Sequence, residues 1–216
     1  MQEILEGIIH LASDGVLGGF KESLRAVLQA KPHLLATPPS WNQYGERVRK
    51  LGGIEHEIFF DEGSQRVWKV GGDNLLNLVV SGGVLSLGGC SILSEYFDRL
   101  FLSDYFFPLG VRIEGIREDG GIVSSQKLVV GGEPTIEQIE LALFRRGFFR
   151  MPEEKVRLAG EAAYYHPERV VVVGEAKPDN FKITAEGAVV AIDVVFAKGR
   201  KYRSLIKAAE DKNRAE

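Results

Sequence analysis

Cysteine and long apolar runs are nearly absent from this sequence. The single cysteine, Cys90, excludes a disulfide within the chain and a metal site built from several cysteines. No apolar run approaches the roughly 20 residues that a membrane-spanning helix needs. The N-terminus has no basic segment followed by an apolar core, so we expect no signal peptide. These absences predict a cytoplasmic protein with no membrane partner.

Excess charge of either sign is lacking too. With 27 Lys and Arg against 30 Asp and Glu, the formal net charge is −3. Such a balance does not indicate nucleic acid as a partner. Hydrophobic residues make up 44% of the 216 residues and charged residues 26%, which is ordinary for a globular protein. A chain of this length can build one domain or two small lobes around a substantial core.

The most informative stretch covers residues 170–196, with the sequence V-V-V-V-G-E-A-K-P-D-N-F-K-I-T-A-E-G-A-V-V-A-I-D-V-V-F. It predicts a buried strand, a polar loop and then a strand–turn–strand. Glu175, Asn180 and Asp193 occupy loop or strand-end positions within it. Carboxylate and amide oxygens gathered at the edge of a small hairpin suit a hard cation such as Mg²⁺.

The spacing of these three residues resembles the catalytic loop and metal-binding hairpin of protein kinases. In that family an Asp is followed five positions later by an Asn, and a later Asp at a strand end binds the metal. Glu175, Asn180 and Asp193 stand at these positions. The sequence is still more similar to the kinase-like domains of phage and mobile-element polyvalent proteins. Their D-A-x-P-x-N and I-D correspond here to E-A-K-P-D-N and A-I-D. The departure is Glu175, where the family has Asp.

The resemblance spans about residues 52–197 and implies an α+β fold, a minimal protein-kinase-like fold with two lobes. We expect an N-terminal helical extension over residues 1–45 and a small lobe with an antiparallel sheet over 46–130. A reduced helical large lobe follows over 131–216. The D-F-G and A-P-E motifs are absent, and little of the chain follows Asp193. The platform for the acceptor is therefore missing, minimal or supplied by another chain.

The stretch Gly52–Val70 alternates apolar and polar residues and predicts a hairpin, with its turn at Glu62–Ser64. Its second strand carries Lys69. The resemblance implies that Lys69 holds the nucleotide phosphates. It also places Gly52 and Gly53 roughly where a Gly-rich loop covers the nucleotide, although the full G-x-G-x-x-G pattern is lacking.

The apolar spacing of Ser91–Phe101 predicts a helix. The resemblance requires an acidic residue on this helix to pair with the strand lysine. Glu95 is the first choice and Asp98 the reserve. Either could equally be a solvated helix charge.

Two further strands are predicted over residues 111–116 and 122–130. The second would lead into a hinge between the lobes near Gln126, where the resemblance implies that backbone groups meet the adenine. After the hinge, Glu133–Phe148 predicts a helix with Thr135 near its start. His166 directly precedes Pro167, a pair that predicts a turn before the strand that follows. This position favours a structural role for His166.

These assignments imply a kinase-like nucleotide-binding protein that uses ATP and Mg²⁺. As a phosphotransferase it would move the γ-phosphate to an unknown hydroxyl acceptor. Lys69 would hold the phosphates with help from Glu95. Asn180 and Asp193 would bind Mg²⁺, and Glu175 would position or deprotonate the acceptor.

Three alternatives stay open. The chain could be a catalytically weak or inactive pseudokinase that acts as a binding module for a protein partner. It could also be a metal-dependent nuclease, because Glu175-Ala176-Lys177 resembles the E-x-K element of restriction-type enzymes. In that case Glu154 or Glu161 would supply the other carboxylate. The last alternative is an α+β domain without catalysis, which stays open because no single motif is complete.

Overall fold

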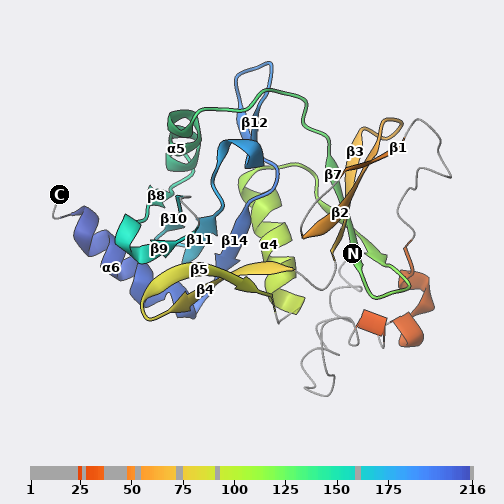
Figure 1. Ribbon diagram of the computed structural model, residues 1–216, viewed down its shortest axis with the longest axis horizontal. Helices are drawn as coiled ribbons and strands as arrows, with labels where there is room; N and C mark the ends of the chain where they lie inside the picture. The colour runs from red at the N-terminus through yellow and green to blue at the C-terminus, as the bar shows by residue number, and fades with distance from the viewer. Residues whose placement is uncertain are drawn as a thin grey trace. The chain divides into compact units, whose positions relative to one another are not determined.

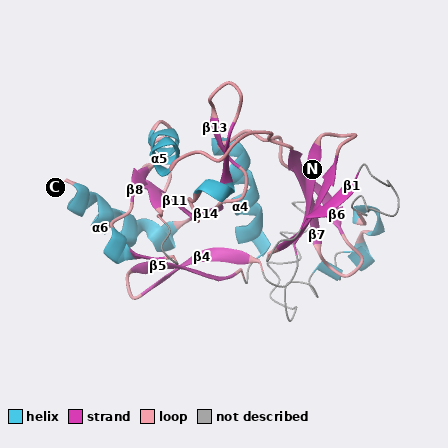
Figure 2. Cartoon of the chain, turned by 45° about the horizontal axis from the view of Figure 1, so that its top comes forward, coloured by secondary structure: helices cyan, strands magenta, loops and turns pink. Residues whose placement is uncertain are grey.

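The structure is a computed structural model that describes residues 24–25, 28–36, 48–51, 55–71, 75–90, 93–158 and 162–214. Short strands, mostly in antiparallel pairs, and a few helices make up the described chain (Figures 1 and 2). The α+β class predicted from the sequence is confirmed. The chain divides into two compact units, which are described separately. Unit 1 contains residues 1–75, 89–97 and 109–128, and unit 2 contains residues 76–88, 98–108 and 129–216.

Unit 1 is built on a five-stranded antiparallel sheet with the order β1-β2-β3-β7-β6. Its strands are β1 (Val48–Leu51), β2 (His56–Asp61), β3 (Arg66–Gly71), β6 (Arg112–Ile116) and β7 (Ile122–Lys127). The predicted hairpin is confirmed, since β2 and β3 pair from His56 opposite Gly71 to Asp61 opposite Arg66. The strands predicted over 111–116 and 122–130 are also present, although β7 ends at Lys127. Strand β1 was not predicted.

The segment before the sheet packs on strand β6. Residues 28–30 are helical, and a short 3-10 helix, η1, covers Pro32–Leu34. A Cβ atom at Gly115 would lie 2.4 Å from the carbonyl oxygen of Leu34, so only glycine allows this approach. Most of the helical extension predicted over residues 1–45 lies outside the described residues.

Unit 2 contains a four-stranded antiparallel sheet with the order β14-β11-β10-β8. Its strands are β8 (Phe149–Arg150), β10 (Tyr164–His166), β11 (Val171–Gly174) and β14 (Val195–Lys198). The strand–turn–strand predicted after Asn180 is confirmed as β12 (Phe181–Ile183) and β13 (Val189–Ala191). A third sheet joins β4 (Leu76–Ser81), β5 (Val84–Gly89) and β9 (Val156–Arg157).

Three α-helices have both ends within the described chain. Helix α4 (Leu93–Phe106) begins in unit 1 and ends in unit 2, while α5 (Ile136–Phe144) and α6 (Arg203–Asn213) belong to unit 2. Thr135 caps α5, because its hydroxyl accepts from the backbone of Gln138 and the Gln138 side chain accepts from the backbone of Thr135. Among the described residues, no helix has the length and apolar character needed to cross a bilayer.

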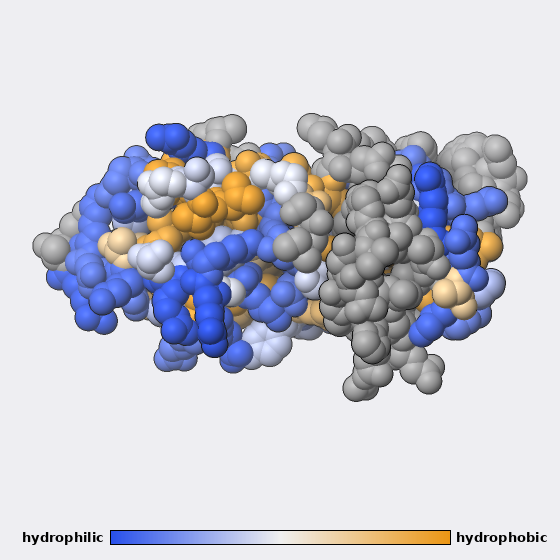
Figure 3. All heavy atoms as spheres, turned by 90° about the horizontal axis from the view of Figure 1, so that it is seen from below, coloured by the Kyte–Doolittle hydropathy of each residue, from blue (hydrophilic) through white to orange (hydrophobic). Residues whose placement is uncertain are grey.

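In the four-stranded sheet of unit 2, strands β10, β11 and β14 are buried on both faces, whereas β8 is exposed. Val171, Val173 and Phe196 join one apolar cluster with aromatic residues of α4 and the loop after α5. Val172 and Ala197 point into a second cluster that includes residues of β4, β5 and α6. Burial on both sides explains why Val170–Val173 is an uninterrupted apolar run instead of an alternating one. Hydrophilic residues cover most of the face in Figure 3 where the chain is described, with an apolar area among them.

Candidate functional site

Asn180 connects Glu175 with Asp193, the two residues of unit 2 that the sequence predicted to act together with it. It lies in the 3-10 helix η4 (Pro178–Asn180) and is 8% exposed. Its side-chain Nδ2 donates to the carbonyl oxygen of Glu175 at 2.9 Å. Its own carbonyl oxygen accepts from the backbone N–H groups of Ile192 at 2.8 Å and Asp193 at 3.3 Å. The loop after β11 and the end of the β12–β13 hairpin are therefore held to each other through one residue.

Glu175 has an unusual backbone conformation. It follows β11 directly and has a φ of 56°, in the left-handed region that residues other than glycine rarely adopt. Its carbonyl oxygen also accepts from the backbone N–H of Lys177 at 2.9 Å. Such a conformation costs about 1–3 kcal/mol and persists where surrounding contacts enforce it, often at functional sites. The two hydrogen bonds to this carbonyl supply that constraint.

The loop is anchored on a packed apolar floor. Ala176, Phe181 and Val194 are buried in the same cluster as β11. The ring of Phe181 lies edge-on to that of Phe107, with 5.9 Å between centroids. A Cβ atom at Gly174 would lie 2.7 Å from Cδ2 of Leu78, so β4 packs tightly against the end of β11. The polar side chains of the loop thus start from a rigid base.

Asp193 leaves the hairpin with its side chain 38% exposed, and one of its oxygens faces a buried arginine. Nη2 of Arg99, on α4, lies 3.8 Å from Oδ1 of Asp193. Sequence reasoning missed Arg99. The available signal was its position four residues after Glu95 in a helix that is otherwise apolar on that side.

In unit 1, Lys69 is buried on β3, between Ile58 of β2 and Ser124 of β7. The same face of the sheet carries Gly71, two positions further along β3. Helix α4 covers this face, because a Cβ atom at Gly71 would lie 3.3 Å from the hydroxyl oxygen of Tyr96. Glu95 precedes Tyr96 and is partly buried. The fold of unit 1 therefore brings the helix that carries Glu95 to the side of the sheet from which Lys69 projects.

The Tyr96 contact is reinforced from β2. Nε2 of His56 and the hydroxyl of Tyr96 form a buried hydrogen bond of 3.0 Å. His56 is paired with Gly71 across the two strands, so both lie on the Lys69 face. This bond fixes the first turns of α4 over that face.

The other predicted residues have different surroundings. Asp98, the reserve partner of Lys69, lies in unit 2 with its Oδ1 2.8 Å from Nζ of Lys198. Gln126 is partly buried near the end of β7, opposite Val67. Gly52 and Gly53 lie outside the described residues.

Of the two carboxylates considered for a nuclease, Glu154 lies in the described chain and pairs with a lysine. The side chain of Glu154 is exposed and bonds to Lys212 at 2.6 Å, which lowers the pKa of this carboxyl. Glu161 lies outside the described residues. Restriction-type chemistry needs a second carboxylate beside the E-x-K lysine, and Glu154 is engaged elsewhere.

Asn180 and Asp193 carry an amide and a carboxylate oxygen, which are ligand types that Mg²⁺ accepts. Because Nδ2 of Asn180 is used to donate to Glu175, its Oδ1 is the side-chain atom left for a ligand. Mg²⁺ binds through one or two protein oxygens together with substrate phosphates and water. Across the ranges described, no three His, Cys, Asp or Glu side chains gather into a metal site of their own. An amide and a carboxylate would thus need phosphates to complete the shell.

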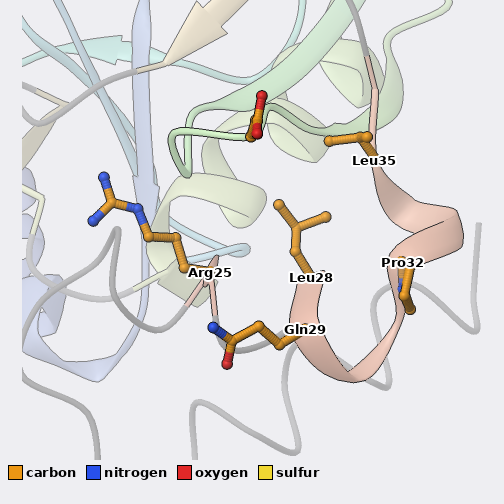
Figure 4. Close-up of a pocket in the computed structure, with 6 residues that line it drawn as sticks. Arg25, Leu28, Gln29, Pro32 and Leu35 are labelled. Atoms are coloured by element: carbon orange, nitrogen blue, oxygen red, sulfur yellow. The ribbon is translucent and has the colours of Figure 1, made fainter.

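Two pockets in the described chain lie apart from the predicted residues. One, of about 320 Å³, lies in unit 1 and is bordered by Leu28 and Leu35 (Figure 4). Its lining residues are Arg25, Leu28, Gln29, Pro32, Leu35 and Glu118. The other, of about 350 Å³ in unit 2, is lined by residues 150–154 with Lys212 and Asn213. Neither includes Lys69, Glu175 or Asp193.

The chain was compared with protein-family models, curated proteins and solved structures. No protein-family model, curated protein or solved structure matches the chain.

Proposed function

We propose that this chain is a kinase-like nucleotide-binding protein that transfers the γ-phosphate of ATP to a hydroxyl acceptor. The single observation that supports this most is the position of Asn180, which bonds to Glu175 through its side chain and to Asp193 through its carbonyl oxygen. These are the three residues that the resemblance assigned to acceptor activation and metal binding. Their spacing in the sequence left open whether they meet.

A second support comes from unit 1. Lys69 is buried on a central strand, and a buried lysine needs a compensating anion. The helix that carries Glu95 covers the same face, as the Tyr96 contacts indicate. In the proposed reaction Lys69 binds the nucleotide phosphates and Glu95 orients it.

In the proposed phosphate transfer, each chemical step is assigned to a residue of this chain. The bond between the γ-phosphorus and the β–γ bridging oxygen breaks, and a bond from the acceptor oxygen to that phosphorus forms. The acceptor proton passes to the Glu175 carboxylate, and ADP leaves with the bridging oxygen. Mg²⁺, when bound, would neutralise charge on the phosphates. Asn180 and Asp193 would hold it, and Lys69 would add a positive charge on the phosphates.

The pseudokinase alternative is favoured by one observation, the identity of residue 175. Glu is longer than Asp by one methylene, which moves the carboxylate by about 1.5 Å. A misplacement of about 1 Å can cost about 100-fold in rate. The left-handed backbone of Glu175 changes where that side chain starts and could offset the extra length. Binding and transfer must therefore be measured separately.

The first experiment is thermal unfolding with excess ATP, with and without Mg²⁺. A ligand bound only by the folded state at a hundredfold excess over its Kd adds about 2.7 kcal/mol. For a chain of this size the midpoint would rise by roughly 5–10 °C. We expect Lys69→Met and Asp193→Asn to abolish the rise. Arg112→Met is the matched control, because Arg112 is exposed on β6 of the Lys69 sheet.

Phosphate transfer is then measured with γ-labelled ATP, using the chain itself and casein as acceptors. A nucleotide-dependent shift together with transfer supports the phosphotransferase. A shift without transfer, even at long times, supports the pseudokinase. The absence of any shift with Mg²⁺ and ATP in the unaltered protein would contradict nucleotide binding altogether.

A further inference from the structure

Arg99 is a buried cation that contacts the segment carrying Asp193. The residue is 5% exposed and lies on the part of α4 that belongs to unit 2. Its Nε donates to the carbonyl oxygen of Val194 at 3.4 Å, and Nη1 donates to that of Leu76 at 3.3 Å. Nη2 faces Oδ1 of Asp193 at 3.8 Å. One guanidinium therefore joins α4, β4 and the end of the β12–β13 hairpin.

Arg146 offers a comparison within the same unit, because its guanidinium is paired with backbone carbonyl oxygens. Arg146 is only partly buried, and it donates through Nε to the carbonyl of Phe106 and through Nη1 to that of Ala142, each at 2.8 Å. Its guanidinium carbon also lies 4.2 Å from the ring centre of Phe107. Arg99 differs from Arg146 because it also reaches a carboxylate, and that carboxylate is the one assigned to the metal.

The Asp193 carboxylate can therefore interact both with Arg99 and with a ligand from solvent. Burial of a charge is costly unless an opposite charge and hydrogen bonds accompany it, and Asp193 supplies an opposite charge to Arg99. The Asp193 side chain is at the same time 38% exposed, so it can meet a ligand from solvent. A divalent cation bound there would share the carboxylate with Arg99.

We propose that Arg99 is a positioning residue that acts through Asp193. It holds the carboxylate against α4 before a cation arrives, and its positive charge weakens the binding of a divalent cation at that carboxylate. This inference rests on the proposed function insofar as the cation is the Mg²⁺ that accompanies ATP. A single charge about 6 Å from a divalent ion, even at the dielectric constant of water, changes its affinity by about tenfold.

The test measures the Mg²⁺ concentration that gives half of the thermal shift, in the presence of a non-hydrolysable ATP analogue. We expect Arg99→Met to lower this concentration by about tenfold. Arg99→Lys keeps the charge and should stay within about threefold of the unaltered protein. Arg146→Met is the control for removing a guanidinium from the same unit, and it should not change the concentration. An unchanged or higher Mg²⁺ requirement in Arg99→Met would overturn the proposal.

A second measurement does not depend on nucleotide or metal. Urea unfolding of Asp193→Asn, Arg99→Met and the double variant forms a double-mutant cycle. Asp193→Asn should destabilise the unaltered protein more than it destabilises the Arg99→Met background, because only the former leaves a buried charge without its carboxylate. Equal losses in the two backgrounds would overturn the pairing. A coupled cycle without any shift by Mg²⁺ and the ATP analogue would instead sink the proposed function and the metal role of Arg99, while retaining the pair.

Discussion

The side-chain amide of Asn180 donates to the backbone carbonyl of Glu175 at 2.9 Å. This hydrogen bond closes the loop that begins at Glu175 and ends at Asn180. The carbonyl that it reaches belongs to a residue in the left-handed conformation. A loop closed in this way keeps Glu175 at a defined distance from the hairpin that ends at Asp193. Stability and proposed chemistry thus depend on the same hydrogen bond.

Replacing Asn180 by Asp removes the donor without changing the size of the side chain. We expect the free energy of unfolding to fall by about 1–3 kcal/mol, because the Glu175 carbonyl loses a partner in a largely buried setting. Urea denaturation measures the change. Asn213→Asp is the control: Asn213 also donates to a carbonyl, that of Arg150, but it is exposed and should cost less than about 1 kcal/mol. Equal losses for the two variants would show that the loop bond has no special weight.

Replacing Glu175 by Gln keeps the length of the side chain and removes its ability to take a proton. Transfer of the γ-phosphate should fall by about 10²–10⁴-fold, the usual contribution of a general base. The thermal shift with Mg²⁺ and ATP should stay as in the unaltered protein. Glu186→Gln, at the exposed turn of the β12–β13 hairpin, should change neither quantity. Transfer that survives Glu175→Gln would remove Glu175 from the base role.

Gly131 and Gly132 offer a matched pair next to the β12 strand. A Cβ atom at Gly131 would lie 2.2 Å from the carbonyl oxygen of Ile183, whereas one at Gly132 would meet only Cγ2 of Ile183, at 3.7 Å. Gly131→Ala should therefore lower the free energy of unfolding by about 1–3 kcal/mol, since backbone must move. Gly132→Ala should stay within about 0.5 kcal/mol. Chemical denaturation of the two variants decides the point, and similar values would contradict the close approach.

His166 should make stability depend on pH. Burial among the rings of Phe106 and Phe148 lowers the pKa of His166 below its usual 6.5, and the nearby Arg169 lowers it further. The unfolded chain then binds the proton more readily than the folded chain. The contribution of His166 is fully present above pH 6.5 and is lost as the pH falls from there through the lowered folded pKa.

Unfolding free energies measured at several pH values between 7.5 and 5.5 test this expectation. The unaltered protein should lose more stability over that range than His166→Gln, which has no group that titrates there. Parallel curves for the two proteins would mean that other groups dominate. The contacts of His166 with two phenylalanines fit the structural role that its sequence context favoured.

Local patterns predicted most of the regular elements correctly. Alternating apolar residues located β2 and β3, and the spacing of Ile136, Ile139 and Leu143 located α5. These patterns succeed because an element that buries one face must repeat its apolar residues with the period of the backbone. The start of α5 was predictable for a further reason, because Thr135 satisfies free backbone groups within its own segment.

Elements with weaker local signals were missed or misjudged. Residues 81–89 are rich in glycine and carry weak secondary-structure signals, yet they form the turn and the second strand of the β4–β5 hairpin. Gly82 and Gly83 are its turn, with φ values of 59° and 76° that suit glycine. Helix α6 continues to Asn213, although its last four residues, 210–213, are all polar or charged. Its later turns are retained by contacts such as that of Lys212 with Glu154, which lies far away in the sequence.

By itself, the sequence determined the α+β class and the β2–β3 and β12–β13 hairpins, because a hairpin depends on apolar alternation and turn residues a few positions apart. Tertiary structure alone decided that Asn180 holds Glu175 and Asp193, that Lys69 lies buried under α4, and that Arg99 faces Asp193. Those relationships join segments between 5 and about 95 positions apart. Over such separations hydrogen bonds and charges are set by packing, which no local periodicity encodes.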